Sequence, residues 1–250
     1  MSLDSAVVHY TVAAATDRGR KRSSNEDAFG YSAEQGVYLV CDGMGGAAAG
    51  EIASALAVDE ILRHLIGRDP AKPLPQAAEE AVRAANDAVF SRSQHDAKLH
   101  GMGTTMVCLV AQEHSAWVLN IGDSRCYRLR NRSLEQLTMD HSLVDEQVRL
   151  GQMTPSDALR SPYRNVITRA LGTQSLVTPD ILELETEPGD IFLLCSDGLT
   201  RELPDPLIES LLSVDSPGDV SLSDLCARLV SAANKAGGED NITCLLVRAG

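Results

Sequence analysis

The chain has 250 residues, of which 44% are apolar and 23% are charged, and its formal net charge is −13. This composition is that of one soluble globular domain, and the acidity argues against a nucleic-acid backbone as a partner. No apolar run approaches the roughly 18 residues of a membrane span, and no basic leader precedes an apolar core, so we expect neither a membrane segment nor a secretory signal. The six cysteines form no CxxC pair and mostly lie in apolar runs, which predicts reduced thiols and a cytoplasmic location.

The predicted elements fall into blocks of strands and blocks of helices. Short apolar runs predict strands at 7–14, 28–31, 37–41, 104–111, 115–121, 126–130, 134–137, 166–169, 181–185, 191–195 and 242–247. Longer amphipathic patterns predict helices at 49–66, 76–93, 143–150, 206–213 and 222–236, and a Thr-Pro pair predicts another, with Thr154 as its N-cap and Pro155 as its first residue. Antiparallel strands with helices in separate blocks indicate the α+β class, in which two packed sheets carry helices on the outside.

Aspartates lie at the ends of several predicted strands. Asp42, Asp123 and Asp197 follow apolar runs, each beside a glycine, and Asp240 comes just before the last strand. Because one strand's start lies beside its neighbour's end in an antiparallel sheet, these four carboxylates can meet at one edge. Without a cation they would repel one another and be costly to bury, so the pattern predicts a metal site. The simpler alternative for Asp42 and Gly43 is an ordinary strand-ending turn.

Two polar segments stand out beside these strands. The first brings Arg22, Glu26 and Asp27 to a junction between a loop and the second predicted strand. Taken alone, Arg22 fits a solvated loop residue, because other basic residues lie next to it. The second segment, Asp140 to Pro162, interrupts the strand pattern with short helices, a glycine and two prolines. Loops of this kind on a rigid scaffold commonly carry specificity.

Eight sequence blocks, in chain order, are similar to a known family. They are RSSNEDAFG, VCDGMGGAAAGE, GTTMVCLV, NIGDSRCYRLR, LTMDHSLV, ITRALG, LLCSDGLT and GGEDNIT. Together they resemble the metal-dependent protein phosphatases of the 2C type, and the bacterial serine/threonine phosphatase branch most of all. The resemblance covers about 8–247. It implies a single catalytic domain over 1–250, built as a four-layer α-β-β-α sandwich, with a flap subdomain at about 140–165.

The resemblance also implies the ligands of a two-metal centre. By motif, Asp42 would bridge two ions, with Asp197 and Asp240 completing one site and the Gly43 carbonyl serving the other. Such oxygen ligands suit Mn²⁺ or Mg²⁺ better than zinc. Two ions of this kind can activate a water molecule for in-line attack on phosphorus, so no side-chain nucleophile is required. The implied activity is hydrolysis of phosphoserine and phosphothreonine monoesters.

Further residues take roles by the same motif match. Glu26 and Asp27 would hold the waters of the second metal, directly or from outside its ligand shell. Arg22 falls where the family has its phosphate-binding arginine, and a planar guanidinium can grip two phosphate oxygens. Asp123 would hold a third, weaker metal ion. The alternative for its GDSR block is an Asp–Arg pair that fixes a hairpin.

Two positions depart from the family pattern. Met44 stands where eukaryotic members carry a histidine that is a proposed general acid, so a metal-bound water or His141 would have to donate the proton. A structural role at a helix start is the other interpretation of His141. Arg201 stands where many members place an acidic residue, one turn after a metal-ligand position. A cation there opposes a third divalent ion unless its guanidinium turns outward, toward Glu202 or Asp205, so we expect a weak third site.

The expected partners are phosphorylated proteins, the substrates of a serine/threonine kinase, and the chain is expected to act as a monomer. Two other function classes remain open at this stage. One is a catalytically silent relative that acts as a binding or regulatory module. The other is a metal-dependent hydrolase of small phosphoesters or a nuclease, although the net negative charge weakens the nuclease version.

Overall fold

A computed structural model describes residues 9–46, 49–213 and 220–250 of the chain. Its strands are β1 (Tyr10–Asp17), β2 (Asp27–Ser32), β3 (Val37–Met44), β4 (Gly103–Thr104), β5 (Met106–Ala111), β6 (Ser115–Ile121), β7 (Arg125–Arg130), β8 (Ser133–Gln136), β9 (Asp180–Glu185), β10 (Ile191–Cys195) and β11 (Ile242–Ala249). Its helices are α1 (Ala49–Ile66), α2 (Leu74–His95), the 3₁₀ helix η1 (Ala97–Leu99), α3 (Leu143–Arg149), α4 (Pro155–Ala158), α5 (Asp197–Thr200), α6 (Asp205–Leu212) and α7 (Leu222–Ala236).

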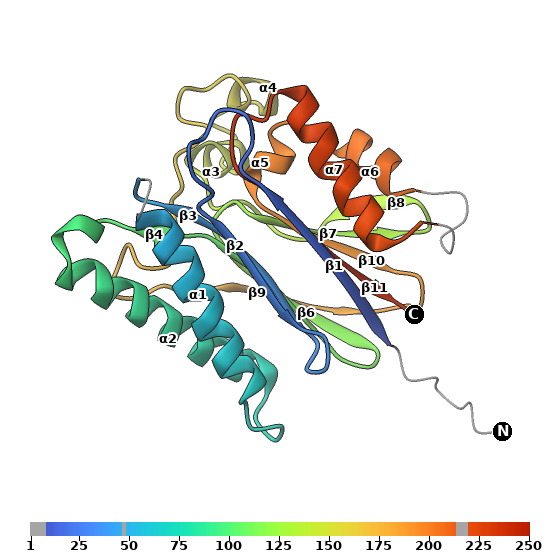
Figure 1. The fold of residues 1–250 in the computed structure, drawn as a ribbon, viewed down its shortest axis with the longest axis horizontal. Coiled ribbons are helices and arrows are strands. Elements are labelled where there is room, and N and C mark those ends of the chain that lie inside the picture. The colour runs from blue at the N-terminus through green and yellow to red at the C-terminus, as the bar shows by residue number, and fades with distance from the viewer. Residues whose placement is uncertain (1–8, 47–48, 214–219) are drawn as a thin grey trace.

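The strands form two antiparallel sheets that lie face to face (Figure 1). One sheet has the order β1-β11-β10-β7-β8, and the other has the order β2-β3-β5-β6-β9, with the short strand β4 paired to β3. The strands predicted at 104–111 and 115–121 pair as the hairpin β5–β6, and those predicted at 126–130 and 134–137 pair as β7–β8. The chain crosses between the sheets several times, so residues from distant parts of the sequence meet at the sheet ends.

Three apolar layers hold the four-layer sandwich together. α1 and α2 cover the β2-β3-β5-β6-β9 sheet, α6 and α7 cover the other sheet, and a third layer fills the space between the sheets (Figure 1). The α-β-β-α architecture predicted from the sequence is therefore confirmed. In β3, Leu39 and Cys41 face the helices, whereas Tyr38 and Val40 face the second sheet. Burial on both faces explains why this strand is a continuous apolar run.

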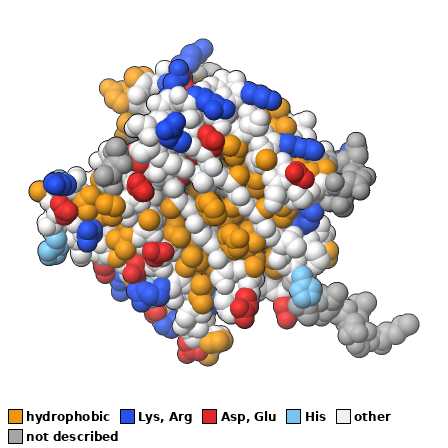
Figure 2. Space-filling view, viewed as in Figure 1, with side chains coloured by type: hydrophobic (Ala, Val, Ile, Leu, Met, Phe, Trp, Pro, Cys, Tyr) orange, Lys and Arg blue, Asp and Glu red, His pale blue; other side chains and the backbone are white. Residues whose placement is uncertain are grey.

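The face drawn in Figure 2 carries the two end strands β1 and β2. Apolar side chains gather at its centre, with acidic and basic side chains around them (Figure 2). Half-buried Val12, Ala14 and Phe29 on these strands pack against the layer between the sheets. Among the described residues, each of these strands pairs on one side only, to β11 or to β3, so the two sheets have one of their open edges here.

Three strand predictions need correction. The predicted strand 166–169 does not form, and Ile167 makes only an isolated bridge to Ser142. The predicted strand 104–111 is divided into two. Thr104 belongs to β4 and pairs with Gly43 of β3, whereas β5 begins only at Met106. The first predicted strand, 7–14, is displaced to β1, and its residues 7 and 8 lie outside the described residues.

The helices follow the predictions closely. The bounds of α1 and α7 are those predicted, and α2 extends the predicted 76–93 by two residues at each end. Thr154 caps α4 as expected, since its hydroxyl accepts the Asp157 N–H. Among the helices of the described residues, none is long and apolar enough to cross a membrane. All six cysteines are buried free thiols.

Candidate metal and phosphate site

Asp42 lies inside β3, directly opposite Asp27 of β2. The strand continues to Met44, so the alternative of a strand-ending turn at Asp42 is wrong. Two threonines fix the Asp42 backbone. The Asp42 N–H donates to Thr105 Oγ1 at 2.9 Å, and the Thr104 hydroxyl donates to the Asp42 carbonyl at 2.9 Å. The Asp42 side chain therefore starts from a rigid position, as a metal ligand requires.

Gly43 sits where the backbone of three segments comes together. Its N–H donates to the Glu26 carbonyl at 3.1 Å. A Cβ atom at Gly43 would overlap the Gly50 carbonyl and would lie 2.6 Å from the Glu26 carbonyl oxygen. A Cβ atom at Gly50 would overlap the Glu26 carboxylate in turn. Both positions therefore need glycine, because only glycine lets the start of α1 approach β2 and β3 so closely.

The predicted convergence of the four aspartates is confirmed. Asp197 begins α5 directly after β10, Asp123 lies in the turn between β6 and β7, and Asp240 precedes β11. Burial raises the pKa of Asp42 well above its ordinary value, and the nearby carboxylates raise it further: Asp27, Asp197, Asp123 and Asp240. These strand ends meet at one end of the sandwich and place excess negative charge there.

The other carboxylates of this group respond in the same way. Burial raises the pKa of Asp197, and the Asp123 charge adds to the effect. Burial also raises the pKa of Asp27 to about 6, although hydrogen bonds from neighbouring hydroxyls oppose the rise. A group of acids that resists ionisation in this manner favours a cation close by.

The donor atoms fit hard divalent cations. Within the described part of the chain, Asp27 Oδ1, Asp123 Oδ1 and Asp197 Oδ1 are buried without a hydrogen-bond partner. Buried carboxylate oxygens that lack a partner are the atoms that Mn²⁺ or Mg²⁺ would bind. No group of three or more His, Cys, Asp or Glu side chains in the described ranges is already arranged around a metal position. Two guanidinium groups, those of Arg22 and Arg201, contact these carboxylates instead.

Arg22 is the first of these guanidinium groups. Its Nη2 atom donates to Asp240 Oδ2 at 2.8 Å, and its side chain is 51% exposed. The side chain thus lies at the rim of the acidic group with half its surface open to a ligand. The contact with Asp240 argues against the simple solvated-loop interpretation.

Arg201 is the second, and it points inward. Its guanidinium pairs with Asp197 and lies 3.5 Å from Asp123 Oδ2. The outward orientation considered from the sequence is wrong. Both suggested outward partners are engaged elsewhere, because Glu202 accepts the Glu239 N–H and Asp205 accepts the Tyr127 hydroxyl.

The ring of His141 is held by a backbone N–H and by a carboxylate, neither of which lines the pocket. The Gly122 N–H donates to His141 Nδ1 at 3.1 Å, so Nε2 carries the proton and donates to Asp180 at 3.1 Å. The ring is buried beside Ser142, the N-cap of α3. This geometry supports the structural interpretation of His141, because its ring steadies the turn that carries Asp123.

The alternative for the GDSR block is also settled by geometry. Arg125 makes three hydrogen bonds of 2.7–3.0 Å to Asp140. The arginine therefore ties β7 to the segment after β8, and the carboxylate of Asp123 remains directed at the acidic group. The Asp–Arg pair that fixes this region exists, but Asp140 and not Asp123 supplies the acid.

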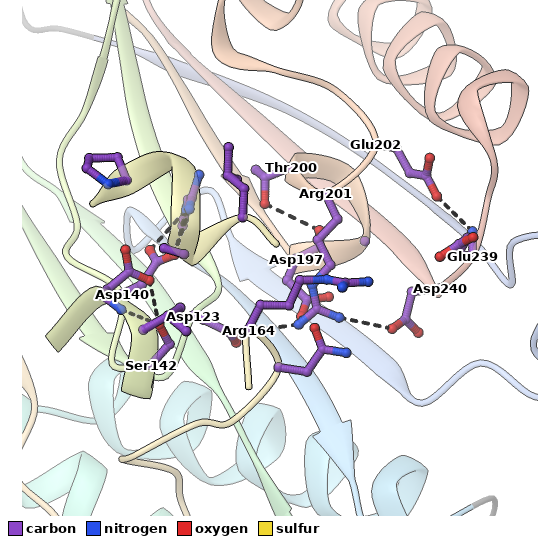
Figure 3. Close-up of a pocket in the computed structure, with 18 of the residues that line it drawn as sticks. Asp123, Asp140, Ser142, Arg164, Asp197, Thr200, Arg201, Glu202, Glu239 and Asp240 are labelled. Carbon is purple, nitrogen blue, oxygen red and sulfur yellow. Dashed lines mark hydrogen bonds and ion pairs between the residues drawn. The ribbon is translucent and has the colours of Figure 1, made fainter. Parts of the chain in front are cut away.

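A pocket of about 620 Å³ opens over these carboxylates (Figure 3). Asp123, Asp197 and Asp240 line one side of it together with Arg22 and Arg201. The segment predicted as a flap (residues 140–165) supplies further lining residues, among them Val144, Val148, Ala158, Leu159 and Arg164. The pocket therefore joins a charged centre to a partly apolar wall.

Four supporting residues were not singled out from the sequence. Thr104 and Thr105 hold Asp42, as described above, and Ser196 donates to Asp27 Oδ2 at 2.7 Å. Asn241 accepts the Glu26 N–H and donates to the Ser24 carbonyl, so it fixes the loop that carries Arg22. Each of the four lies next to a predicted ligand or inside a matched sequence block. That position in the sequence is the signal that could have identified them as supporting residues.

Comparisons with known proteins place this geometry in a family. The family model for protein phosphatase 2C matches residues 16–246. Serine/threonine phosphatase stp of Listeria monocytogenes is 37% identical over 238 residues, which cover 93% of this chain and 93% of that protein. Serine/threonine protein phosphatase PstP of Mycobacterium tuberculosis is 37% identical over 234 residues, which cover 94% of this chain and 44% of PstP.

Solved structures agree. The crystal structure of the M. tuberculosis phosphatase PstP/Ppp matches with a TM-score of 0.88 at 36% identity, covering 96% of this chain and 98% of that one. The PstP catalytic domain in complex with two manganese ions matches with a TM-score of 0.85 at 33% identity, covering 97% and 98%. The chain belongs to the protein phosphatase 2C family, and it is an enzyme of the serine/threonine protein phosphatase class.

Proposed function

We propose that this chain removes phosphate from phosphoserine and phosphothreonine in proteins, with two divalent cations held by the carboxylates at the end of the sandwich. The observation that carries the proposal is the meeting of Asp42, Asp123, Asp197 and Asp240 at one end of the sandwich, where, within the described residues, the Oδ1 atoms of Asp123 and Asp197 are buried without a hydrogen-bond partner. The manganese-bound PstP catalytic domain, a structural relative, supports Mn²⁺ as the first metal to test.

Each of these residues has a proposed role that depends on its position. Asp42 would hold both metal ions, Asp197 and Asp240 would hold one of them, and the Gly43 carbonyl would hold the other. Glu26 and Asp27 would hold the waters of the second ion, directly or from outside its ligand shell, and Ser196 orients Asp27. Metal ions bound here supply Lewis-acid activation of water near neutral pH.

Arg22 is the proposed phosphate-binding residue. Its guanidinium now contacts Asp240, and it is half exposed at the rim of the pocket. With Asp240 engaged as a metal ligand, Arg22 would be free to bind two oxygens of a phosphate group. Met44 cannot donate a proton, and His141 is committed to Gly122 and Asp180, so a solvent molecule remains as the proton donor for the leaving alkoxide.

The substrate is proposed to be a phosphorylated protein segment, produced by a serine/threonine kinase. The flap supports this, because its apolar side chains line the pocket next to the charged centre and can contact residues that flank a phosphorylated side chain. We treat residues 140–165 as a flap subdomain of a single catalytic domain that acts as a monomer. The buried free thiols support a reducing, cytoplasmic environment.

Phosphate release by the purified chain tests the proposal. With Mn²⁺, kcat/KM for a phosphothreonine peptide should exceed that for a nucleotide monophosphate, and a chelator should abolish both reactions reversibly. Preference for the nucleotide would favour a small-phosphoester hydrolase instead. No turnover of the peptide or of p-nitrophenyl phosphate in Mn²⁺ would indicate a catalytically silent relative.

A further inference from the structure

Arg201 brings a fixed positive charge into the middle of the acidic centre. Its Nη2 atom pairs with Asp197 and lies 3.5 Å from Asp123 Oδ2, and its Nη1 atom lies 3.6 Å from Asp240 Oδ2. Only 31% of the side chain is exposed. One guanidinium therefore contacts three carboxylates that arrive from three different strand ends.

The contacts divide the oxygens of these carboxylates into two sets. Asp123 Oδ2 and Asp197 Oδ2 face Arg201, whereas the Oδ1 atoms of both residues are buried without a hydrogen-bond partner in the described part of the chain. Each of the two aspartates thus has one oxygen beside the guanidinium and one oxygen left for a second cation. The arginine can stay in place while Asp197 binds metal through its other oxygen.

We propose that Arg201 is a built-in cation of this centre, which offsets part of the negative charge of Asp123, Asp197 and Asp240 in the metal-free chain and prevents a divalent ion from binding firmly beside Asp123. The proposal rests on the proposed function, because it assumes that the remaining oxygens bind two metal ions. An arginine keeps its charge under all ordinary conditions, so it cannot be lost to a chelator as a bound ion can.

The charge of Arg201 and its position have two consequences. Carboxylates that meet without a cation destabilise the fold, and Arg201 supplies one positive charge to three of them. The same charge repels a divalent ion at the third metal position, beside Asp123. The family resemblance leads one to expect an additional acid there in place of Arg201. Arg201 thus stabilises the metal-free centre and lowers the number of ions that the centre holds.

Thermal unfolding in a chelator tests the first half of the proposal. Arg201→Ala should lower Tm by at least about 3 °C in chelator, and saturating Mn²⁺ should remove most of that difference. Arg164→Ala is the matched control, because it deletes another arginine that lines the same pocket. It should leave Tm unchanged in both buffers. A wild-type Tm for Arg201→Ala in chelator, or a loss that Mn²⁺ does not restore, would overturn the role as internal cation.

Counting bound Mn²⁺ by calorimetry or by equilibrium dialysis tests the second half. Arg201→Asp should bind one more Mn²⁺ per chain than the wild type, and Arg201→Asn, which is neutral and easier to fold, should bind it more weakly. An unchanged Mn²⁺ count for both variants would refute the proposal. These readouts do not require turnover, so a wild-type chain that binds Mn²⁺ but releases no phosphate would contradict the proposed function alone.

Discussion

Asp27 and Asp42 face each other directly across the β2–β3 pair. Like charges in opposite positions of an antiparallel pair destabilise a sheet, and these two also lie beside three more aspartates. Such a pair persists in a folded protein when something else requires it. Here the requirement is a place for cations, and the cost is greatest when no cation is bound.

The first prediction uses the pKa of Asp27, which burial raises from 3.8 to about 6. Because the folded chain then binds this proton more tightly than the unfolded chain, the stabilisation is present at low pH and is lost as pH rises through about 6. In chelator, the free energy of unfolding of the wild type should fall by about 1 kcal/mol more between pH 5 and pH 7 than that of Asp27→Asn. Urea unfolding at the two pH values measures this, and equal losses in both proteins would contradict it.

The second prediction concerns the proposed metal ligands. Asp42→Asn or Asp197→Asn should reduce kcat with Mn²⁺ by more than the roughly 10–100-fold that loss of an outer-shell partner costs, because each removes an anionic ligand. Circular dichroism should show an intact fold, and the Tm of Asp42→Asn in chelator should not fall, since a repelling charge is removed. Glu239→Gln is the control, because this exposed carboxylate also lines the pocket and should be replaceable. Near-wild-type turnover by Asp42→Asn would refute the ligand assignment.

The third prediction concerns Arg22. Arg22→Ala should lower kcat/KM for phosphomonoesters by about 10-fold or more, the effect of one charge-assisted contact of about 1.5–3 kcal/mol. Mn²⁺ affinity should change little, because Arg22 is not a ligand. Lys21→Ala, which removes an exposed neighbouring charge from the same loop, is the matched control. If both variants have the same kcat/KM, Arg22 is only a solvated loop residue.

The fourth prediction concerns the flap. Leu159 is 79% exposed and lines the pocket, whereas Leu150 of the same segment is 70% exposed and does not. Leu159→Ala should therefore lower kcat/KM for a phosphopeptide several-fold while leaving p-nitrophenyl phosphate turnover almost unchanged. Leu150→Ala should affect neither substrate. Equal losses on both substrates for Leu159→Ala would show that the flap acts on catalysis and not on peptide recognition.

Much of this fold was predictable because its signals are local. The bounds of α1 and α7 are predicted by helical periodicity. The position of Asp42 at the end of a buried strand segment is predicted by the apolar run before it, which is buried on both faces. The meeting of the aspartates was also predictable, since antiparallel pairing brings strand starts beside strand ends.

What the sequence did not reveal depends on contacts between distant segments. Residues 166–169 have strand-forming side chains but meet no continuous partner, so Ile167 forms a single bridge. Strand β3 extends to Met44 because Gly43 and Met44 find partners in β4, about 60 residues later. The inward direction of Arg201 depends on three carboxylates from separate strand ends, which no sequence spacing specifies.

Anomalous scattering from crystals soaked in Mn²⁺ tests the central claim most directly. Two peaks about 3.5–4 Å apart are predicted within bonding distance of Asp42, with Asp197 and Asp240 at one peak and the Gly43 carbonyl at the other. A strong third peak at Asp123 should appear only in Arg201→Asp. The account would be contradicted if wild-type crystals, soaked at a Mn²⁺ concentration that supports turnover, showed no peak within bonding distance of Asp42.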